Sequence, residues 1–460
     1  MNSAPALVAH DRTTPAAFRA TGSVDAPAQA PVIVKLIAAV SIVVVAMQIV
    51  LPQGVEVGYI VAALLMPLWI PAVRRFRGMP VLMLLGVAAV GAGLWLRVAN
   101  ADDHAVDTSI ATSTTVLLIG AILSIGLLLW TRTLFSVSTV ALLFGVGLFL
   151  GISPSAAQFA SNPYKFGFAI PLAVVLLALA KLSRRWWVEL IVVLVLSGLS
   201  AANDARATFA LLLLAAILLL AQLPVFRVGH RGSASLVALG IVVVGIVVYN
   251  LGTALVLSGL LGQSTTERSL AQVNASGSLV LGGRPELGAT IALIGQKVWG
   301  FGAGVSPSPS EVVTAKEGMK AIGYDPNNGY VERYMFGGHV ELHSVFGDLW
   351  AQTGVIGLAF VFVAAVLMIY GLTRNIADGL AAGVLLYVVA KSLWDLAFSP
   401  FFSAEPLFVL AIGLVAIPVT RGAGQRVYSI TESIGPIRRA ARWKPSRAKT
   451  AASLSDEAAG

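Results

Sequence analysis

Residues 337–358 read GGHVELHSVFGDLWAQTGVIGL and join a long polar segment to an apolar one. The polar stretch ends at His343 and Ser344, and apolar residues then predominate as far as residue 371. A helix that crosses a bilayer needs about 20 mainly apolar residues. This junction therefore predicts a membrane-spanning helix that begins near His343 and follows a large polar loop.

The composition points to the same class for the whole chain. Of 460 residues, 57% are hydrophobic and only 12% are charged, which is typical of a polytopic membrane protein. There is no cysteine, so disulfides, thiolate catalysis and cysteine-ligated zinc are excluded. The net charge of +9 comes from short connections and from the C-terminal tail, which argues against a nucleic-acid partner.

Apolar runs recur along the chain and predict an all-α polytopic membrane protein with about 12 transmembrane helices and one large extracytoplasmic loop. The runs lie at residues 32–50, 55–73, 79–98, 109–130, 134–152, 167–181, 187–202, 207–224, 235–258, 344–371, 379–398 and 404–420.

These runs divide the chain into segments of different character. Residues 1–30 are rich in Ala, Pro and Thr and are predicted to be a disordered tail. Residues 31–258 hold transmembrane helices 1–9, residues 259–342 the large extracytoplasmic loop, and residues 343–420 helices 10–12. Residues 421–460 form a basic tail.

Basic residues are concentrated in alternate connections and predict the orientation. Arg74, Arg132, Arg184, Arg227 and Arg374 all lie in one set of alternate connections, and the basic tail follows the last run. The positive-inside rule places this set and both termini in the cytoplasm, and residues 259–342 outside. The expected location is the cytoplasmic membrane, where membrane lipids surround the protein.

The large loop is too long for an ordinary connection, and loops of this length usually carry function. Within it, residues 285–298 are predicted to form a helix, because Pro285 suits the first helical position and apolar residues recur on one face. This helix is expected to lie on, or dip into, the outer surface. The glycine-rich segment 300–304 follows and would allow close approach of the backbone.

Two arginines on the expected outer side are candidate phosphate ligands. Arg206 follows a very short turn, and a basic residue there runs against the orientation bias. A simple ion pair with Asp204, or an interfacial arginine that extends to water, is the alternative for Arg206. Arg284 stands just before the predicted loop helix, where an ordinary surface arginine is the alternative.

His343 is the candidate general base, because an imidazole can accept a proton near neutral pH. A helix N-terminus also favours a nearby anionic group. The alternative is an interfacial histidine bonded to backbone. His339 lies four residues earlier, which is a metal spacing if this turn is helical. Glu341 would then point elsewhere, and no metalloprotease pattern surrounds the pair, so no metal is expected.

A charged pair occurs within the eleventh apolar run. Lys391 and Asp395 lie one helical turn apart and are expected to neutralise each other in lipid rather than to bind substrate.

Three motifs, taken in order, resemble the bacterial O-antigen ligase and O-antigen polymerase superfamily. Ser200–Ala207 resembles the Ser-Arg motif that opens a span in that family. Gly283–Leu287 with Gly300–Gly304 resembles its Gly-Arg and Gly-x-Gly loop, and His343–Ser344 with Gly354–Leu358 resembles its His-Asn/Ser and Gly-x-x-Gly-Leu motif. The number of runs and the large loop before the histidine fit as well.

The chain departs from the family pattern at two positions. Ala205 stands where the family usually has Ser, and Gly288 stands where it often has Trp.

The resemblance implies a metal-independent inverting glycosyltransferase of the membrane-embedded GT-C type, with no cofactor. Its donor would be a glycan on polyprenyl pyrophosphate, and its acceptor a sugar or a lipid-linked glycan. Arg206 and Arg284 would hold the pyrophosphate, because arginine bonds phosphate oxygens in pairs and stays charged. His343 would deprotonate the acceptor hydroxyl, which then attacks the anomeric carbon.

Ligase and polymerase differ mainly in the acceptor, and both remain open, with a polymerase of surface or exopolysaccharide favoured. The competing class is a transporter or flippase of lipid-linked sugar. It predicts several charged groups at mid-membrane and no long outer loop.

Overall fold

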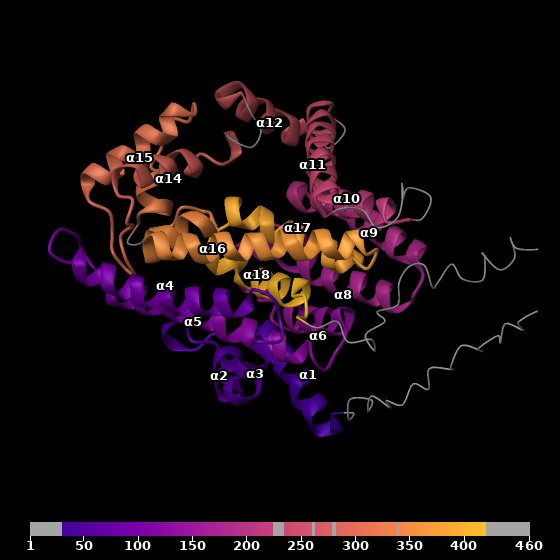
Figure 1. The fold of residues 1–460 in the computed structure, drawn as a ribbon. Coiled ribbons are helices and arrows are strands. Elements are labelled where there is room, and N and C mark those ends of the chain that lie inside the picture. The colour runs from indigo at the N-terminus through magenta and orange to yellow at the C-terminus, as the bar shows by residue number, and fades with distance from the viewer. Residues whose placement is uncertain (1–29, 224–233, 260–262, 278–281, 338–339, 420–460) are drawn as a thin grey trace, which may run out of the picture.

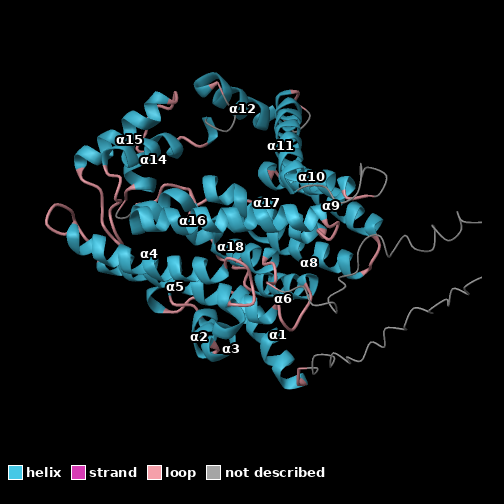
Figure 2. Cartoon of the chain, in the orientation of Figure 1, coloured by secondary structure: helices cyan, strands magenta, loops and turns pink. Residues whose placement is uncertain are grey.

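The computed structural model describes residues 30–223, 234–259, 263–277, 282–337 and 340–419, and helices make up most of these segments (Figure 1). No β-strand occurs within the described segments (Figure 2), which hold only isolated β-bridges such as that between Val106 and Val305. The predicted all-α class is therefore confirmed. The expected basic tail, and the expected N-terminal tail up to residue 29, lie outside the described residues.

Each predicted apolar run coincides with a helix or a pair of helices. The second run is divided at Leu65, because Pro67 lacks the N–H that a continuous helix would bond to Ala63. The helices are α1 (Val32–Ala46), α2 (Val57–Leu64), α3 (Met66–Val73), α4 (Met79–Ala99), α5 (Thr108–Thr131), α6 (Val137–Leu150), α8 (Ala169–Leu182), α9 (Trp186–Ala202), α10 (Arg206–Ala221), α11 (Ala234–Leu257), α16 (Val345–Ala377), α17 (Gly383–Phe398) and α18 (Phe401–Val415).

Five helices in the described part of the chain are long and apolar enough to cross a membrane: α4, α5, Tyr164–Leu182, Val237–Ala254 within α11, and α16. Shorter apolar helices, among them α1, α6, α9, α10 and α18, accompany them. This set is compatible with a membrane protein.

The helices pack around α16 and α17. In Figure 1, α4 runs alongside α16 with α5 next to α4, and α17 and α18 also lie next to α16, whereas α11 runs steeply across this direction. The contacts between the helices are mostly apolar: the rings of Phe360 in α16 and Phe408 in α18, for example, lie 5.9 Å apart. Small residues let the helices approach closely, and Gly413 of α18 packs directly on Leu128 of α5.

Residues of the large loop cover one end of this bundle, where α4 ends and α5, α16 and α18 begin; we call it the loop end. The loop contains α12 (Gln263–Ser276), α14 (Glu286–Gln296), α15 (Pro309–Ala321) and the short π-helix η3 (Val331–Met335). α14 and α15 lie beside the loop end of α16 (Figure 1). They build a small apolar core that includes Leu293, Phe301 and Trp350.

The helix predicted over residues 285–298 is confirmed as α14, with Pro285 at its N-cap. Its buried face holds Ala289 and Leu293, whereas Ile291 is 72% exposed. α12 and α15 were not predicted, because they are polar and lack an apolar period long enough to stand out.

α14 and α15 cross with their backbones in contact. A Cβ at Gly288 would lie 2.3 Å from the carbonyl oxygen of Gly318, and a Cβ at Gly318 would lie 2.2 Å from that of Gly288. Such distances leave no room for a side chain at either position. The crossing explains why residue 288 is glycine, at the position where the O-antigen ligase and polymerase superfamily often has Trp.

The glycine-rich segment joins the loop to the bundle. Gly300, Gly302 and Gly304 have φ values of 82°, 110° and 72°, which side chains other than hydrogen disfavour. A Cβ at Gly302 would lie 2.4 Å from the backbone nitrogen of Arg97 in α4, and the N–H of Gly302 donates to the carbonyl of Ala351 in α16 at 2.9 Å. The predicted close backbone approach is therefore confirmed.

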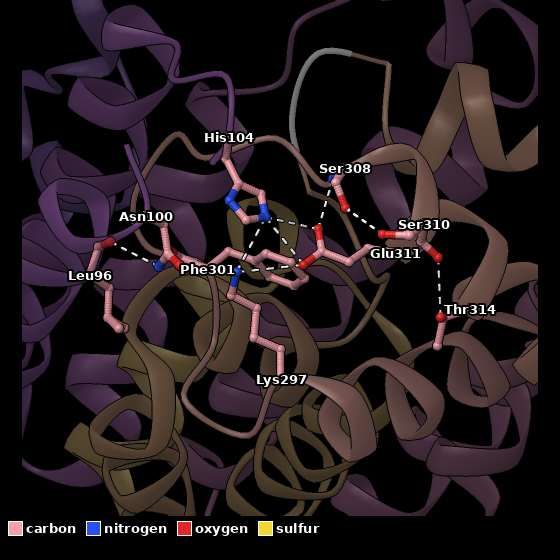
Figure 3. A network of polar contacts seen from close by, with 9 residues as sticks. All are labelled: Leu96, Asn100, His104, Lys297, Phe301, Ser308, Ser310, Glu311 and Thr314. Carbon is pink, nitrogen blue, oxygen red and sulfur yellow. Dashed lines mark hydrogen bonds and ion pairs between the residues drawn. The ribbon is translucent and has the colours of Figure 1, made fainter. Parts of the chain in front are cut away.

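A buried polar network fixes the same segment to the α4–α5 connection (Figure 3). Nε2 of His104 lies 3.0 Å from Oε2 of Glu311 and 3.2 Å from Nζ of Lys297. Asn100 donates through Nδ2 to the carbonyl of Phe301 at 2.7 Å. The network joins residues that are far apart in sequence, so it holds the loop in one position on the bundle.

Glu311 is stabilised in this network as a carboxylate. It closes the capping box of α15, where the backbone N–H of Ser308 donates to Oε2 at 2.7 Å. Burial alone raises the pKa of Glu311, but the hydrogen bonds from Ser308 and the interaction with His104 outweigh burial and lower it below its ordinary value. The attachment of the loop therefore relies on a charged Glu311.

Candidate functional site

His343 lies just before the first turn of α16, close to its predicted position. Ser344 is the N-cap, and its Oγ accepts from the N–H of Gly347 at 2.9 Å. His343 has a φ of 51°, in the left-handed region that residues with a side chain seldom adopt. Its neighbours hold this conformation, since Oδ1 of Asp348 accepts from the N–H of Leu342 at 2.7 Å.

The imidazole of His343 has a carboxylate partner. Nε2 lies 3.3 Å from Oε1 of Glu341, and both side chains are about four-fifths buried, with 21% and 17% of their surfaces exposed. Nδ1 is buried and has no hydrogen-bond partner among the described residues. When Nε2 donates to Glu341, Nδ1 carries the lone pair, which is the atom that can accept a proton.

The expectation that Glu341 points away from His343 is wrong. It assumed a helical turn before His343, whereas the described residues 340–344 are not helical, and the left-handed backbone at His343 turns the two side chains together. His339 lies outside the described residues. Within those residues, no group of three or more His, Asp or Glu is arranged to hold a metal ion.

A tyrosine of the large loop packs against the same histidine. Tyr330 is the N-cap of η3, and its ring centroid lies 6.2 Å from that of His343. Its hydroxyl donates a short hydrogen bond to Oε1 of Glu286, in the first turn of α14. Tyr330 therefore connects the start of α14 to the start of α16.

Arg284 also influences the pKa of the Tyr330 hydroxyl. Burial raises the pKa of the Tyr330 hydroxyl and the carboxylate of Glu286 raises it further, whereas Arg284 lowers it. Arg284 is half-buried just ahead of Pro285, the N-cap of α14. Tyr330 thus packs on His343 and bonds Glu286, which stands two residues after Arg284.

Arg206 contacts a different part of the large loop. It is the first residue of α10, and its Nη1 donates to the buried hydroxyl of Ser269 in α12 at 2.8 Å. Its Nε lies 3.6 Å from Oδ1 of Asp204, whose other oxygen lies 3.6 Å from Nζ of Lys165. The ion pair with Asp204 that the sequence left open is present, and α12 additionally covers the arginine.

The contacts of Arg206 with described residues are thus to α12 and to its own turn, not to Tyr330 or His343. Arg284 and His343 come from the two segments that frame Tyr330, and Arg206 is joined to the same large loop through Ser269.

Sequence reasoning missed Glu341, Tyr330 and Glu286. Glu286 stands two residues after Arg284 and could have been noticed as a buried acid in the first turn of a predicted helix. Tyr330 lies in an irregular stretch with no periodic pattern, and only the fold brings it to His343. The contact of Glu341 with His343 involves an unusual backbone conformation at His343, which no residue pattern predicts.

No protein-family model matches the chain, and no curated protein sequence matches it. The likeness to the O-antigen ligase and polymerase superfamily therefore rests on the motifs at residues 200–207, 283–304 and 343–358.

Proposed function

We propose that this protein transfers a glycan from a polyprenyl-pyrophosphate-linked donor to a sugar hydroxyl at the outer face of the cytoplasmic membrane. It acts as a metal-independent inverting glycosyltransferase. One observation carries the proposal: His343 packs on the ring of Tyr330, whose hydroxyl bonds Glu286 in the first turn of α14, two residues after Arg284. A proton acceptor beside a fixed cation suits a reaction that removes a proton and releases a pyrophosphate.

His343 serves as the general base through Nδ1. The acceptor hydroxyl gives its proton to Nδ1 while its oxygen forms a bond to the anomeric carbon of the donor. The bond from that carbon to the pyrophosphate oxygen breaks, and its electron pair leaves with the polyprenyl pyrophosphate. Glu341, at 3.3 Å from Nε2, keeps the imidazole in the required tautomer and balances the positive charge that it gains.

The arginines hold the leaving group. Arg284 stands two residues before Glu286, which bonds Tyr330 beside the base, and it stabilises the charge that develops on the pyrophosphate. Arg206 begins the 16-residue helix α10, whose dipole adds positive potential at that N-terminus. The polyprenyl chain extends among the apolar helices. The acceptor hydroxyl belongs to another repeat unit in a polymerase or to a lipid-anchored core in a ligase. We favour the polymerase.

The alternative, a transporter or flippase of lipid-linked sugar, requires charged groups that a substrate can reach inside the bundle. The charged pair of α17 is instead closed on itself. Nζ of Lys391 lies 2.5 and 2.6 Å from the two oxygens of Asp395, and Ser399 donates to the same carboxylate. The predicted mutual neutralisation is confirmed, and this favours the enzyme.

The test uses the full-length protein in lipid nanodiscs with the lipid-linked oligosaccharide extracted from the source strain. Mass spectrometry of the products follows elongated glycan and free polyprenyl pyrophosphate. His343→Ala should lower turnover by about 10²- to 10⁴-fold while donor binding is kept. EDTA should leave turnover unchanged. Normal turnover in His343→Ala, or loss of activity in EDTA restored by a divalent ion, would contradict the proposal.

The proposed orientation is tested separately. Since the chain has no cysteine, single cysteines can be placed at Asn328 in the loop and at Arg184 in an expected cytoplasmic turn. A membrane-impermeant maleimide should label the first in intact cells and the second only after permeabilisation. The reverse pattern would place the proposed site in the cytoplasm and rule out an outer-face reaction.

A further inference from the structure

Aromatic rings of the large loop form a row that runs from the surface to His343. Tyr334 is 63% exposed, and its ring lies 5.6 Å from that of Tyr330 with only 32° between the two planes. Tyr330 in turn lies 6.2 Å from His343. Tyr324 packs edge-on against Tyr330 at 6.3 Å. We call Tyr334, Tyr330 and Tyr324 the tyrosine row.

The row is held in place by hydrogen bonds that leave the exposed ring free. Asn328 donates to the hydroxyl of Tyr324 at 2.8 Å and accepts from the backbone N–H of Tyr330 at 3.0 Å. The hydroxyl of Tyr330 is engaged by Glu286. These contacts fix the inner rings, so the row presents a rigid aromatic surface that begins at Tyr334 and leads towards the proposed base.

A second observation points to a polar ligand beside the row. Glu286 is only 5% exposed, and Oε1 of its carboxylate is held by Tyr330, but Oε2 is buried without a hydrogen-bond partner among the described residues. A buried polar atom normally finds a partner, because leaving it unpaired is costly. A carboxylate oxygen accepts hydrogen bonds only, so the missing partner is a donor such as a hydroxyl.

Aromatic faces combined with a hydrogen-bond acceptor match a sugar ring. The face of an aromatic ring is electron-rich and packs well on the C–H groups of a pyranose, whose hydroxyls project outwards and donate to carboxylates. A phosphate would be repelled by the carboxylate of Glu286. The occupant favoured by this chemistry is a neutral sugar, not the anionic part of the donor.

We infer that the tyrosine row and Glu286 form the subsite that binds the acceptor glycan and leads its terminal sugar to His343. This inference rests on the proposed function, since it names where the second substrate binds. The terminal ring packs on Tyr330 and one of its hydroxyls donates to Oε2 of Glu286, while the preceding sugar packs on Tyr334. The polymer then extends away from the membrane over the loop.

Tyr334→Ala tests the stacking without disturbing the core, because the side chain is largely exposed. In the nanodisc assay the KM for the acceptor should rise about 2- to 10-fold, with kcat and donor affinity unchanged. Tyr334→Phe keeps the ring, so its KM for the acceptor should lie closer to the wild-type value than that of Tyr334→Ala. Val313→Ala removes another exposed apolar side chain of the same loop, in α15, and should have no effect.

Glu286→Gln tests the carboxylate. It keeps the size of the side chain but weakens the acceptor oxygen, so the KM for the acceptor should rise about tenfold. An unchanged acceptor KM in both Tyr334→Ala and Glu286→Gln would overturn the subsite, even if His343→Ala abolished transfer.

A direct binding measurement separates this inference from the proposed reaction. The probe is a two-repeat oligosaccharide cut from the source strain's own surface polysaccharide, and saturation-transfer NMR detects its binding to the nanodisc-embedded protein. Binding that is weakened by Tyr334→Ala supports the subsite even where no glycan transfer is found. No binding to the wild-type protein, or equal binding to Tyr334→Ala, overturns it.

Discussion

The carboxylate of Glu341 lies 3.3 Å from Nε2 of His343, and only Leu342 separates the two residues in the chain. The pairing accompanies an unusual backbone conformation, because His343 adopts a φ of 51° directly before α16. The contact distinguishes the two ring nitrogens: Nε2 is held by Glu341, whereas Nδ1 is buried and has no hydrogen-bond partner among the described residues.

Glu341→Gln is expected to lower kcat about 10- to 100-fold, because a hydrogen bond to a charged partner contributes about 1.5–3 kcal/mol. Donor affinity should not change, since Glu341 lies on the base and not on the pyrophosphate. Turnover and donor binding measured in the nanodisc assay check both points. Glu332→Gln is the matched control, because that exposed loop carboxylate pairs with Lys316. A kcat equal to wild type in Glu341→Gln would remove Glu341 from the mechanism.

Arg206→Lys and Arg284→Lys should each lower kcat/KM for the donor about 10- to 100-fold while the protein still inserts. Lysine keeps the charge but loses the paired hydrogen bonds of the guanidinium. Arg97→Lys is the control, since Arg97 lies at the loop end and bonds Thr108 at 3.0 Å. Should both site variants match this control, the pyrophosphate is held elsewhere.

Glu311→Gln should weaken the attachment of the loop by about 1–3 kcal/mol at pH 7, because it removes the charged acceptor shared by Ser308, His104 and Lys297. The pKa of Glu311 is lowered in the folded state, so its stabilisation is present above the unfolded value of about 4.3 and is lost as the pH falls through the lower folded value. Limited proteolysis of the loop at several pH values measures the attachment.

The difference between wild type and Glu311→Gln should therefore be largest near neutral pH and should shrink below about pH 4. A difference that stays constant down to the most acidic condition would show that the effect comes from side-chain shape and not from charge.

Gly318→Ala should destabilise the loop by about 1–3 kcal/mol, because the added Cβ would lie 2.2 Å from the carbonyl oxygen of Gly288 and force α14 and α15 apart. Gly295→Ala is the opposite case within α14: nothing lies within 4 Å of its Cβ position, and alanine favours helix. Hydrogen exchange of the two helices distinguishes them. Equal protection in both variants would mean that the crossing is looser than described.

The positions of the apolar helices followed from the sequence because length and hydrophobicity alone define them, although the division of the second run at Pro67 was not predicted. α14 was predictable from Pro285 and the apolar period after it. α12 and α15 were not, since their residues are largely polar and only contacts within the loop order them. His343 was identified because it stands where polar sequence becomes apolar, and in the structure α16 begins at this boundary.

The partners of the site residues could not be predicted in the same way. Glu341 contacts His343 in a non-helical segment in which His343 has a left-handed φ, and neither feature could be predicted from the sequence. Tyr330 and Glu286 are 44 residues apart and meet through the packing of the loop. Ser269 belongs to no sequence pattern, and it contacts Arg206 because α12 packs over that arginine.

The bond from Gly302 to Ala351 affects how the protein is assembled during translation. The ribosome delivers residues 300–304 before it delivers α16, and folding proceeds largely as segments emerge. The contact of Ala303 with Gly93 on α4 can form early, but Gly302 has no carbonyl to bond until Ala351 has been made and inserted. A chain truncated before α16 should leave Phe301 uncovered, and membrane quality-control proteases would recognise it as unfinished.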